Sequence, residues 1–379
     1  MKDNTQVFES YSVPRAVRTL ALPSMMGMLV NIVYNLADTF FVGQTGNANM
    51  VAAVSVTMPL FLLFIACGNL FGVGGCAFVS RSLGEGKTER VKTISSFCVY
   101  SAIGVGLVMT VLFLVFRKPV LYAVGASDAT FAYAADYLKY VAIGSPFIVS
   151  SVMLGNLVRG GIARGVITVG LPAAINSLLM SISNMLINVF LQAYGDNAVA
   201  AMGITMKANM LVVMLQLGLA QGVQPLVGYC YGANKLDRMR HSIRFSCVCN
   251  IVLGTVITVI YFIFTRQVVS VFIDDPAVID YGVKMLRALM ISGPVIGCMF
   301  VLNFSFQGMG KGTQSMILSL SRQGLIYFPL LIIMNKTVGL DGIIWSQAVA
   351  DLVCTAMSVV MFLLVVRKLR RQHSQKTKA

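Results

Sequence analysis

Charged side chains are scarce in this sequence. Only 11% of its 379 residues are Asp, Glu, Lys or Arg, while 57% are hydrophobic and the mean hydropathy is +0.80. Soluble domains typically carry about 25% charged residues. The composition therefore excludes an ordinary soluble domain and predicts an all-α protein that crosses a membrane many times.

Residues that serve catalysis or metal binding are also few. The chain has two histidines, His241 and His373, and no Gly-x-x-x-x-Gly-Lys-Ser/Thr loop for a nucleotide. Its eight cysteines include Cys247-x-Cys249, which lacks a partner pair at zinc spacing. We therefore expect no enzyme activity, no cofactor or metal, and no nucleotide as energy source.

Long apolar segments separated by polar turns are what the sequence does contain. Each is about 20 residues or longer, enough to cross a hydrocarbon core of about 30 Å, and we count about ten of them. They lie near 17–42, 51–75, 93–116, 134–158, 164–192, 199–229, 243–265, 280–306, 314–335 and 343–366.

The loops between these segments alternate in charge. Loops and termini on one side hold 20 basic residues, and those on the other side hold only Arg117, Lys118, Arg266 and Lys336. Basic loops are retained in the cytoplasm, so we predict a multi-pass inner (plasma) membrane protein with both termini cytoplasmic. The net charge of +15 then reflects topology and a lipid surface, and we expect no nucleic acid as partner.

An internal repeat organises the chain. The stretch 22–46 returns at 171–195, with an offset of 149 residues, and Pro146 matches Pro294 with an offset of 148. By its glycines, the stretch 72–86 matches 218–233. An even number of spans separates the copies, so they enter the membrane from the same side, which is typical of parallel repeats in transporters.

The two copies differ in length. The first, residues 1–160, forms an N-terminal lobe of four helices; the second, 161–379, forms a lobe of six helices and a basic cytoplasmic tail. If the halves were once equal, two helices are missing between Gly160 and Gly161.

One acid stands out in the first apolar segment. Asn31, Asn35 and Asp38 are spaced i, i+4 and i+7, which places them on one helix face. A carboxylate at membrane depth costs about 2.5 kcal/mol or more, so such groups commonly serve ion or substrate pathways. We interpret this face as a cation-coupling site that alternates between H⁺ or Na⁺ and a cationic ligand. The alternative is an acid capped by amides for helix packing.

A second acid, Asp351, lies in the last apolar segment. It is either part of a second site or the ion-pair partner of Arg322 in the preceding antiparallel helix, and the sequence favours neither. Polar and aromatic side chains in the second half are further candidates for a substrate cavity: Asn184, Asn188, Gln221, Gln224, Gln307, Trp345 and Asp351.

Several stretches resemble the multidrug and toxic compound extrusion (MATE) transporters of the bacterial branch. The resemblance covers nearly the whole chain, and its most specific part is the run from Gln221 to Ala233. The matching stretches are 35–39 with Gly43, QGVQPLVGYCYGA at 221–233, RQG at 322–324 and WSQAVAD at 345–351.

The resemblance implies two six-helix lobes around a central cavity, alternating access, and export of small cationic amphiphilic compounds in exchange for H⁺ or Na⁺. It makes Asp38 the coupling residue of the first lobe and maps the aromatic and acid of the last helix onto Trp345 and Asp351. The family's fifth and sixth helices have no counterpart here. The remaining alternatives are an inactive or regulatory truncated paralogue and an exporter of a lipid-linked or anionic metabolite.

Overall fold

A computed structural model describes residues 7–43, 48–124, 128–157, 193–273 and 275–378, together with positions 183, 186, 187, 190 and 191. This part of the chain is helical throughout and contains no strand. The all-α prediction is confirmed. The helices in the first half are α2 (Val13–Gly43), α3 (Ala48–Gly84), α4 (Thr88–Val115), α5 (Arg117–Ala123) and α6 (Asp128–Leu157). Those in the second half are α8 (Asp196–Gly232), α9 (Leu236–Ile263), α10 (Thr265–Ser270), α11 (Pro276–Gly308), α12 (Gly312–Leu320), the π-helical turn η1 (Ser321–Leu325), α13 (Tyr327–Val338) and α14 (Leu340–Lys378).

Eight candidate membrane spans lie in the described residues. Each coincides with one of the apolar segments predicted from the sequence. A ninth predicted segment, 17–42, falls within α2, and most of 164–192 lies outside the described residues. The spans are Pro59–Gly84, Ser95–Val115, Thr130–Asn156, Ala200–Gly232, Leu236–Ile263, Pro276–Gly308, Gly312–Val338 and Leu340–Leu369.

The internal repeat appears in the helix boundaries. Helices α3, α4, α5 and α6 begin at residues 48, 88, 117 and 128, and α8, α9, α10 and α11 begin at 196, 236, 265 and 276. Every pair is offset by 148 residues. Helices α3 and α8 are both 37 residues long, and α4 and α9 are both 28. The set α3–α6 and the set α8–α11 are therefore two copies of one four-helix unit, in the same orientation.

This offset corrects the expected match of 72–86 with 218–233, which is shifted by one or two residues. The structure pairs Gly86 with Asn234, because these residues occupy the same turn at φ angles of 73° and 58°. Glycine and asparagine tolerate this left-handed conformation after a helix better than other residues do. The geometry of this turn therefore fixes the alignment of the two copies, which the glycines in the sequence alone did not fix.

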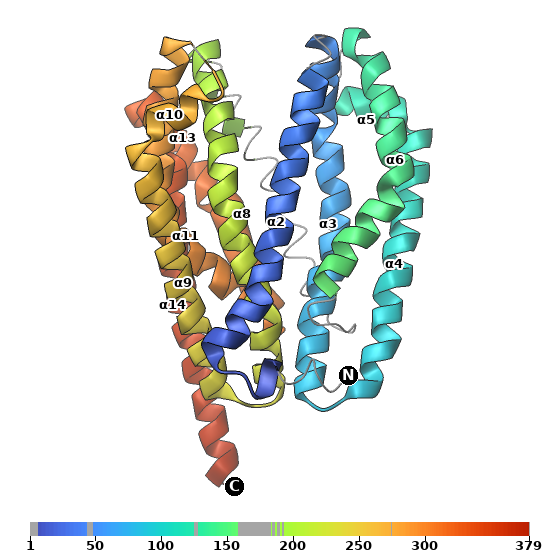
Figure 1. Cartoon of the computed structure of the whole chain (residues 1–379), viewed down its shortest axis with the longest axis vertical. Coiled ribbons are helices and arrows are strands. Elements are labelled where there is room, and N and C mark those ends of the chain that lie inside the picture. The colour runs from blue at the N-terminus through green and yellow to red at the C-terminus, as the bar shows by residue number, and fades with distance from the viewer. Residues whose placement is uncertain are drawn as a thin grey trace.

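The helices form two bundles (Figure 1). Helices α3, α4 and α6 pack together around a core that includes Phe64 and Met153, while α8, α9, α11 and α14 form the other bundle. Helix α2 lies between the bundles, and its first half packs on α8 and α9. Its residues Ala16, Val17 and Ala21 share a core with the second bundle. The described start of the chain and the end of α14 lie at the same end of the molecule.

Candidate functional site

The predicted coupling face lies on α2. The backbone at Asn31, Asn35 and Asp38 is part of the continuous helix Val13–Gly43, so a spacing of i, i+4, i+7 places these positions on one side of it. Their side chains lie outside the described part of the structure. The role of this face in cation coupling therefore stays a prediction.

Close packing holds α2 against the second bundle. A Cβ atom added to Gly218 of α8 would lie 2.8 Å from Met25 Cα, and one added to Gly222 would overlap the backbone of Ala21. Only glycine permits two helices to approach so closely at these positions. The helix that carries Asp38 is thus fixed to α8 of the second repeat, although in the sequence it belongs to the first copy.

The two repeats meet where α3 and α8 end. A Cβ atom on Gly84 would overlap the carbonyl oxygen of Tyr229, and a Cβ atom on Gly232 would overlap the carbonyl oxygen of Arg81. These contacts are reciprocal, because Arg81 and Tyr229, like Gly84 and Gly232, are 148 residues apart. The repeats are therefore related by a pseudo-two-fold axis at this end of the molecule.

Two equivalent residues lie on that axis. A Cβ atom on Gly228 would lie 2.6 Å from Ser80 Oγ and 3.2 Å from Ser80 Cβ. Residues that are equivalent by symmetry contact each other only near the axis that relates them. We call the contacts at Ser80, Gly84, Gly228 and Gly232 the repeat crossing.

One of the predicted cavity residues also bridges the repeats. Gln224 of α8 is 2% exposed, and its Nε2 donates a hydrogen bond of 3.3 Å to the carbonyl oxygen of Val73 in α3. Gln221, one turn earlier, is half-buried. Gln224 therefore stabilises the contact between α3 and α8 in this conformation.

A buried ion pair occupies the second bundle. Arg322 Nε donates to Asp351 Oδ1 at 2.8 Å, and Gln347 Nε2 donates to the same oxygen at 3.1 Å. Ser292 Oγ of α11 donates to Asp351 Oδ2 at 3.3 Å. Asp351 is 3% exposed and Arg322 is 8% exposed. Of the two interpretations left open by the sequence, the structure contains the ion pair, and a role for Asp351 in transport stays a prediction.

The backbone near Arg322 departs from an α-helix. Residues Ser321–Leu325 form a π-helical turn, in which the amide of Ile326 donates to the carbonyl oxygen of Ser321 at 2.9 Å. The guanidinium carbon lies 5.1 Å from the centre of the Phe300 ring. One carboxylate, Asp351, and one aromatic ring, Phe300, contact this cation. The ion pair therefore compensates a charge that would otherwise be costly inside a membrane.

Gln307 belongs to a second buried network. Its Nε2 donates to Ser315 Oγ at 2.9 Å, and Ser315 Oγ donates to Asn303 Oδ1 at 2.6 Å. These bonds join α11 to α12. Trp345, by contrast, is 40% exposed on α14. Asn184 and Asn188 lie outside the described residues.

Some residues of these sites were not predicted from the sequence. Ser292 and Phe300 contact the ion pair from α11, and no motif distinguishes them from other small or aromatic residues. Gly84 and Gly232 have a usable signal, because both recur at the 148-residue offset. A glycine repeated at matching helix ends indicates a close backbone approach.

The family can now be identified. A family model named MatE matches residues 23–164 and 172–333, which is most of the chain. The chain belongs to the MatE family. Its members are membrane transporters, so this chain is a transporter and not an enzyme, and it is an integral, multi-pass plasma-membrane protein.

Curated relatives match over almost their full length. The multidrug export protein MepA of Staphylococcus haemolyticus is 27% identical over 425 positions, with 93% of this chain and 94% of the relative covered. MepA of Staphylococcus aureus strain N315 is 27% identical over 439 positions, with 96% and 97% covered. Both alignments are longer than the 379 residues of this chain, so each relative carries residues without a counterpart here.

Solved structures share the fold. A multidrug resistance MATE family transporter in an outward-facing conformation superposes with a TM-score of 0.90 at 19% identity, covering 96% of this chain and 98% of its own. A MOP superfamily transporter from Pyrococcus furiosus, described as having a binding pocket of reversed polarity, superposes with a TM-score of 0.87 at 20% identity, covering 97% and 98%.

Proposed function

We propose that this chain is a secondary active multidrug exporter that exchanges small cationic amphiphilic compounds for H⁺ or Na⁺. The observation that carries the proposal is the position of α2. This helix bears Asp38 inside an apolar segment, belongs to the first copy in the sequence, and packs closely on α8 of the second repeat. A change in the charge of Asp38 therefore acts where the two repeats must move relative to each other. The similarity to two multidrug export proteins supports this choice of substrate class.

In the proposed cycle, Asp38 binds a proton or Na⁺ when no cationic compound is present, because an apolar surrounding disfavours an unpaired carboxylate. A cationic compound displaces the ion, and the repeats separate at the repeat crossing to open the face at that end of the molecule. The amides of Asn31 and Asn35 assist ion binding. Asn184, Asn188, Gln221, Gln224, Gln307, Trp345 and Asp351 remain cavity candidates.

The structural contacts divide these candidates. Gln224, Gln307 and Asp351 are already engaged in internal hydrogen bonds, which favours a role in holding helices together in this conformation. Trp345 is exposed, so its side chain is better placed to contact a compound. The end of the molecule that carries the basic residues faces the cytoplasm in this proposal.

The test is ethidium efflux from drug-sensitive cells that express the chain. We expect efflux to collapse either with a protonophore or on removal of Na⁺, which names the coupling ion. Asp38→Asn should abolish efflux without lowering the amount of protein in the membrane. The control is Asp280→Asn, which removes an exposed carboxylate paired with Arg266 at 3.3 Å. Full efflux by Asp38→Asn would reject the coupling role.

The length of the alignments favours one alternative. Since the MepA relatives carry residues that this chain lacks, an inactive or regulatory paralogue is the second candidate. It predicts no ethidium efflux from a chain that is well expressed and correctly inserted. The loss of efflux would then be the same in the unmodified chain and in Asp38→Asn.

A further inference from the structure

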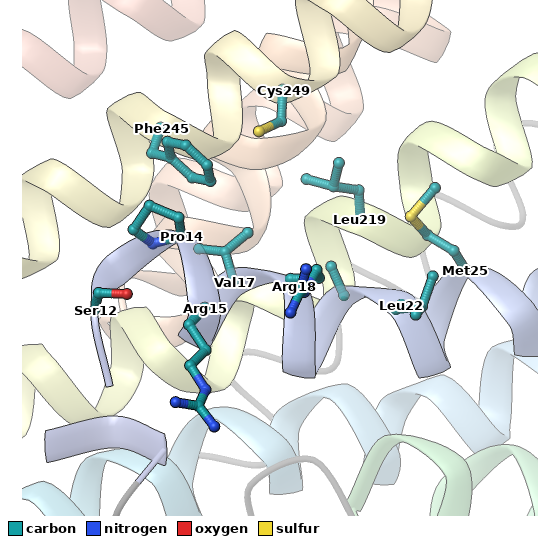
Figure 2. A pocket seen from close by; sticks show the side chains of 11 residues that line it. Ser12, Pro14, Arg15, Val17, Arg18, Leu22, Met25, Leu219, Phe245 and Cys249 are labelled. Atoms are coloured by element: carbon teal, nitrogen blue, oxygen red, sulfur yellow. The ribbon is translucent and has the colours of Figure 1, made fainter. Parts of the chain in front are cut away.

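A groove opens between α2, α8 and α9. It has a volume of about 540 Å³ and is lined by the first turns of α2. The start of α2 lies at the same end of the molecule as the basic turns between α3 and α4 and between α8 and α9. In Figure 2, Phe245 of α9 faces Pro14 and Val17 of α2, and Leu219 of α8 lies near Met25. The described residues that line the groove are apolar except for Ser12, Arg15 and Arg18. Among them, only the two arginines are charged.

The two arginines are available to bind an anion. Arg15 and Arg18 are both exposed, and no carboxylate in the described part of the chain forms an ion pair with either. The Arg15 guanidinium carbon lies 4.3 Å from the centre of the Tyr11 ring. In Figure 2, Arg18 lies between Val17 and Leu22. The groove thus presents unpaired positive charge beside an apolar wall.

An exposed apolar track continues from the groove along α2. Leu22, Met26 and Val30 are 55%, 54% and 68% exposed, and their spacing of four residues places them on one helix face. From Arg18 to Val30 the helix rises about 18 Å. One leaflet of the hydrocarbon core is about 15 Å thick. The track therefore has the length of one acyl chain.

We propose that this groove binds an anionic phospholipid from the leaflet at the basic end of the molecule. Its phosphate contacts Arg15 and Arg18, and one acyl chain lies along Leu22, Met26 and Val30. A free anion would use the arginines but not the track, whereas a neutral lipid would use the track but not the arginines. The combination of both features fits a phospholipid with a net negative charge.

The single tryptophan of the chain makes a direct test possible. In the variant Trp345→Phe/Phe245→Trp, the only tryptophan lines the groove. The protein is reconstituted in vesicles in which either phosphatidylglycerol or phosphatidylcholine carries bromine atoms that quench tryptophan fluorescence on contact. We expect brominated phosphatidylglycerol to quench at about 25-fold lower mole fraction, since each of the two arginines contributes a factor of about five near an anionic lipid surface.

Two pairs of substitutions, each made in the Trp345→Phe/Phe245→Trp variant, test whether Arg15 and Arg18 cause the preference for phosphatidylglycerol. Arg15→Gln/Arg18→Gln should abolish the preference for phosphatidylglycerol. The matched control is Arg244→Gln/Arg367→Gln, which removes two exposed arginines at the same end that do not line the groove. Arg244 is the immediate chain neighbour of Phe245, so it lies at the same depth. The control should retain the preference.

Three results would overturn the proposal. The first is equal quenching by the two lipids while Arg15 and Arg18 are present. The second is an equal loss of preference in the control, which would indicate a general effect of surface charge. The third is loss of the preference on addition of inorganic phosphate but not of sodium chloride at the same ionic strength, which would indicate a site for a soluble anion.

Discussion

The two repeats have the same backbone arrangement but differ in the side chains that lie between their helices. Gly106 of α4 approaches Pro146 of α6 so closely that a Cβ atom would overlap the proline backbone, and the equivalent Gly254 of α9 approaches Gly293 of α11 in the same way. The crossing of these two helices therefore depends on a small residue in both copies. The geometry was retained while the side chains around it changed.

The second repeat adds polar anchors at that crossing. Gln216 Nε2 donates to the carbonyl oxygen of Gly293 at 2.7 Å, and Asn250 Nδ2 donates to that of Gly297 at 3.4 Å. The equivalent positions in the first repeat hold Gly68 and Ala102, which cannot form such bonds. The first repeat uses a different bond there, because Ser145 Oγ donates to the carbonyl oxygen of Gly106 at 2.9 Å. The comparison teaches that backbone proximity sets the fold of each repeat, and that each repeat secures the crossing with its own side-chain hydrogen bonds.

The largest effect that we predict concerns the ion pair of the second half. Asp351→Asn leaves Arg322 buried without its anion, so unfolding should become easier by about 3–5 kcal/mol. The measurement is thermal unfolding of the detergent-solubilised protein. Arg322→Met/Asp351→Leu should recover most of the loss, because it removes both charges. A double variant as unstable as the single one would contradict this explanation.

Valine substitutions at the repeat crossing come next. Gly84→Val and Gly232→Val each force a side chain against a carbonyl oxygen of the other repeat, and overpacking of this kind costs about 1–3 kcal/mol. Because the contacts are reciprocal, the two variants should be destabilised to a similar extent. Gly104→Val, at a position where a Cβ atom meets nothing within 4 Å, is the control. Destabilisation by only one of these two variants would contradict the reciprocal contact between the repeats.

A smaller effect is expected for two equivalent threonines. Thr110 Oγ1 donates to the carbonyl oxygen of Ala142 at 2.7 Å, and Thr258 Oγ1 donates to that of Met290 at 3.2 Å. Hydrogen bonds between membrane helices contribute about 0.6 kcal/mol on average. Thr110→Val and Thr258→Val should each lower the unfolding free energy by about this amount. Since Gln216 and Asn250 remain in the second repeat, Thr258→Val should not be the more harmful variant.

The smallest effect depends on pH and concerns the N-terminal segment. Glu9 accepts a hydrogen bond of 2.6 Å from Tyr229 Oη and lies 3.6 Å from Lys235 Nζ. These contacts, the tyrosine bond first, hold the pKa of Glu9 below its ordinary value. The stabilisation is therefore present above the ordinary carboxyl pKa of about 4.3 and disappears as the pH falls through the lowered value.

Hydrogen exchange of residues 7–12 measures this contact. Exchange corrected for intrinsic rate should stay slow at neutral pH and accelerate as Glu9 becomes protonated. In Glu9→Gln the corrected exchange should no longer change over that range. A pH response that persists in Glu9→Gln would assign the effect to another group.

Apolar length and loop charge were sufficient to predict most of the membrane segments, because each span requires about 20 apolar residues whatever its neighbours. The π-helical turn at Ser321–Leu325 was not predictable, since 314–335 has the composition of one uninterrupted span. The packing of α2 on α8 was equally hidden, because it depends on Gly218 and Gly222 facing Met25 and Ala21. Sequence alone does not say which glycines face another helix.

For the candidate site, the sequence predicted some of the contacting residues and missed others. A pair between Arg322 and Asp351 was one of two alternatives, because Arg322 lies in the antiparallel segment that precedes that of Asp351. The two side chains lie 2.8 Å apart. Ser292 completes the carboxylate's hydrogen bonds from α11, a helix that is distant in sequence. Its position follows only from the three-dimensional packing. For Asp38 the sequence supplies the helix face, and experiment must supply its partners.

The central claim is that the repeat crossing separates during transport, and a reversible cross-link tests it most directly. Ser80→Cys/Gly228→Cys places two thiols on the pseudo-two-fold axis, where the Cβ separation of 3.2 Å is close to the 3.5–4.5 Å of a disulfide. Ethidium efflux is measured in proteoliposomes after oxidation and again after reduction, with each single cysteine variant as a control. We predict that efflux stops on oxidation and returns on reduction in the double variant alone. Full efflux from a completely cross-linked protein would contradict the account.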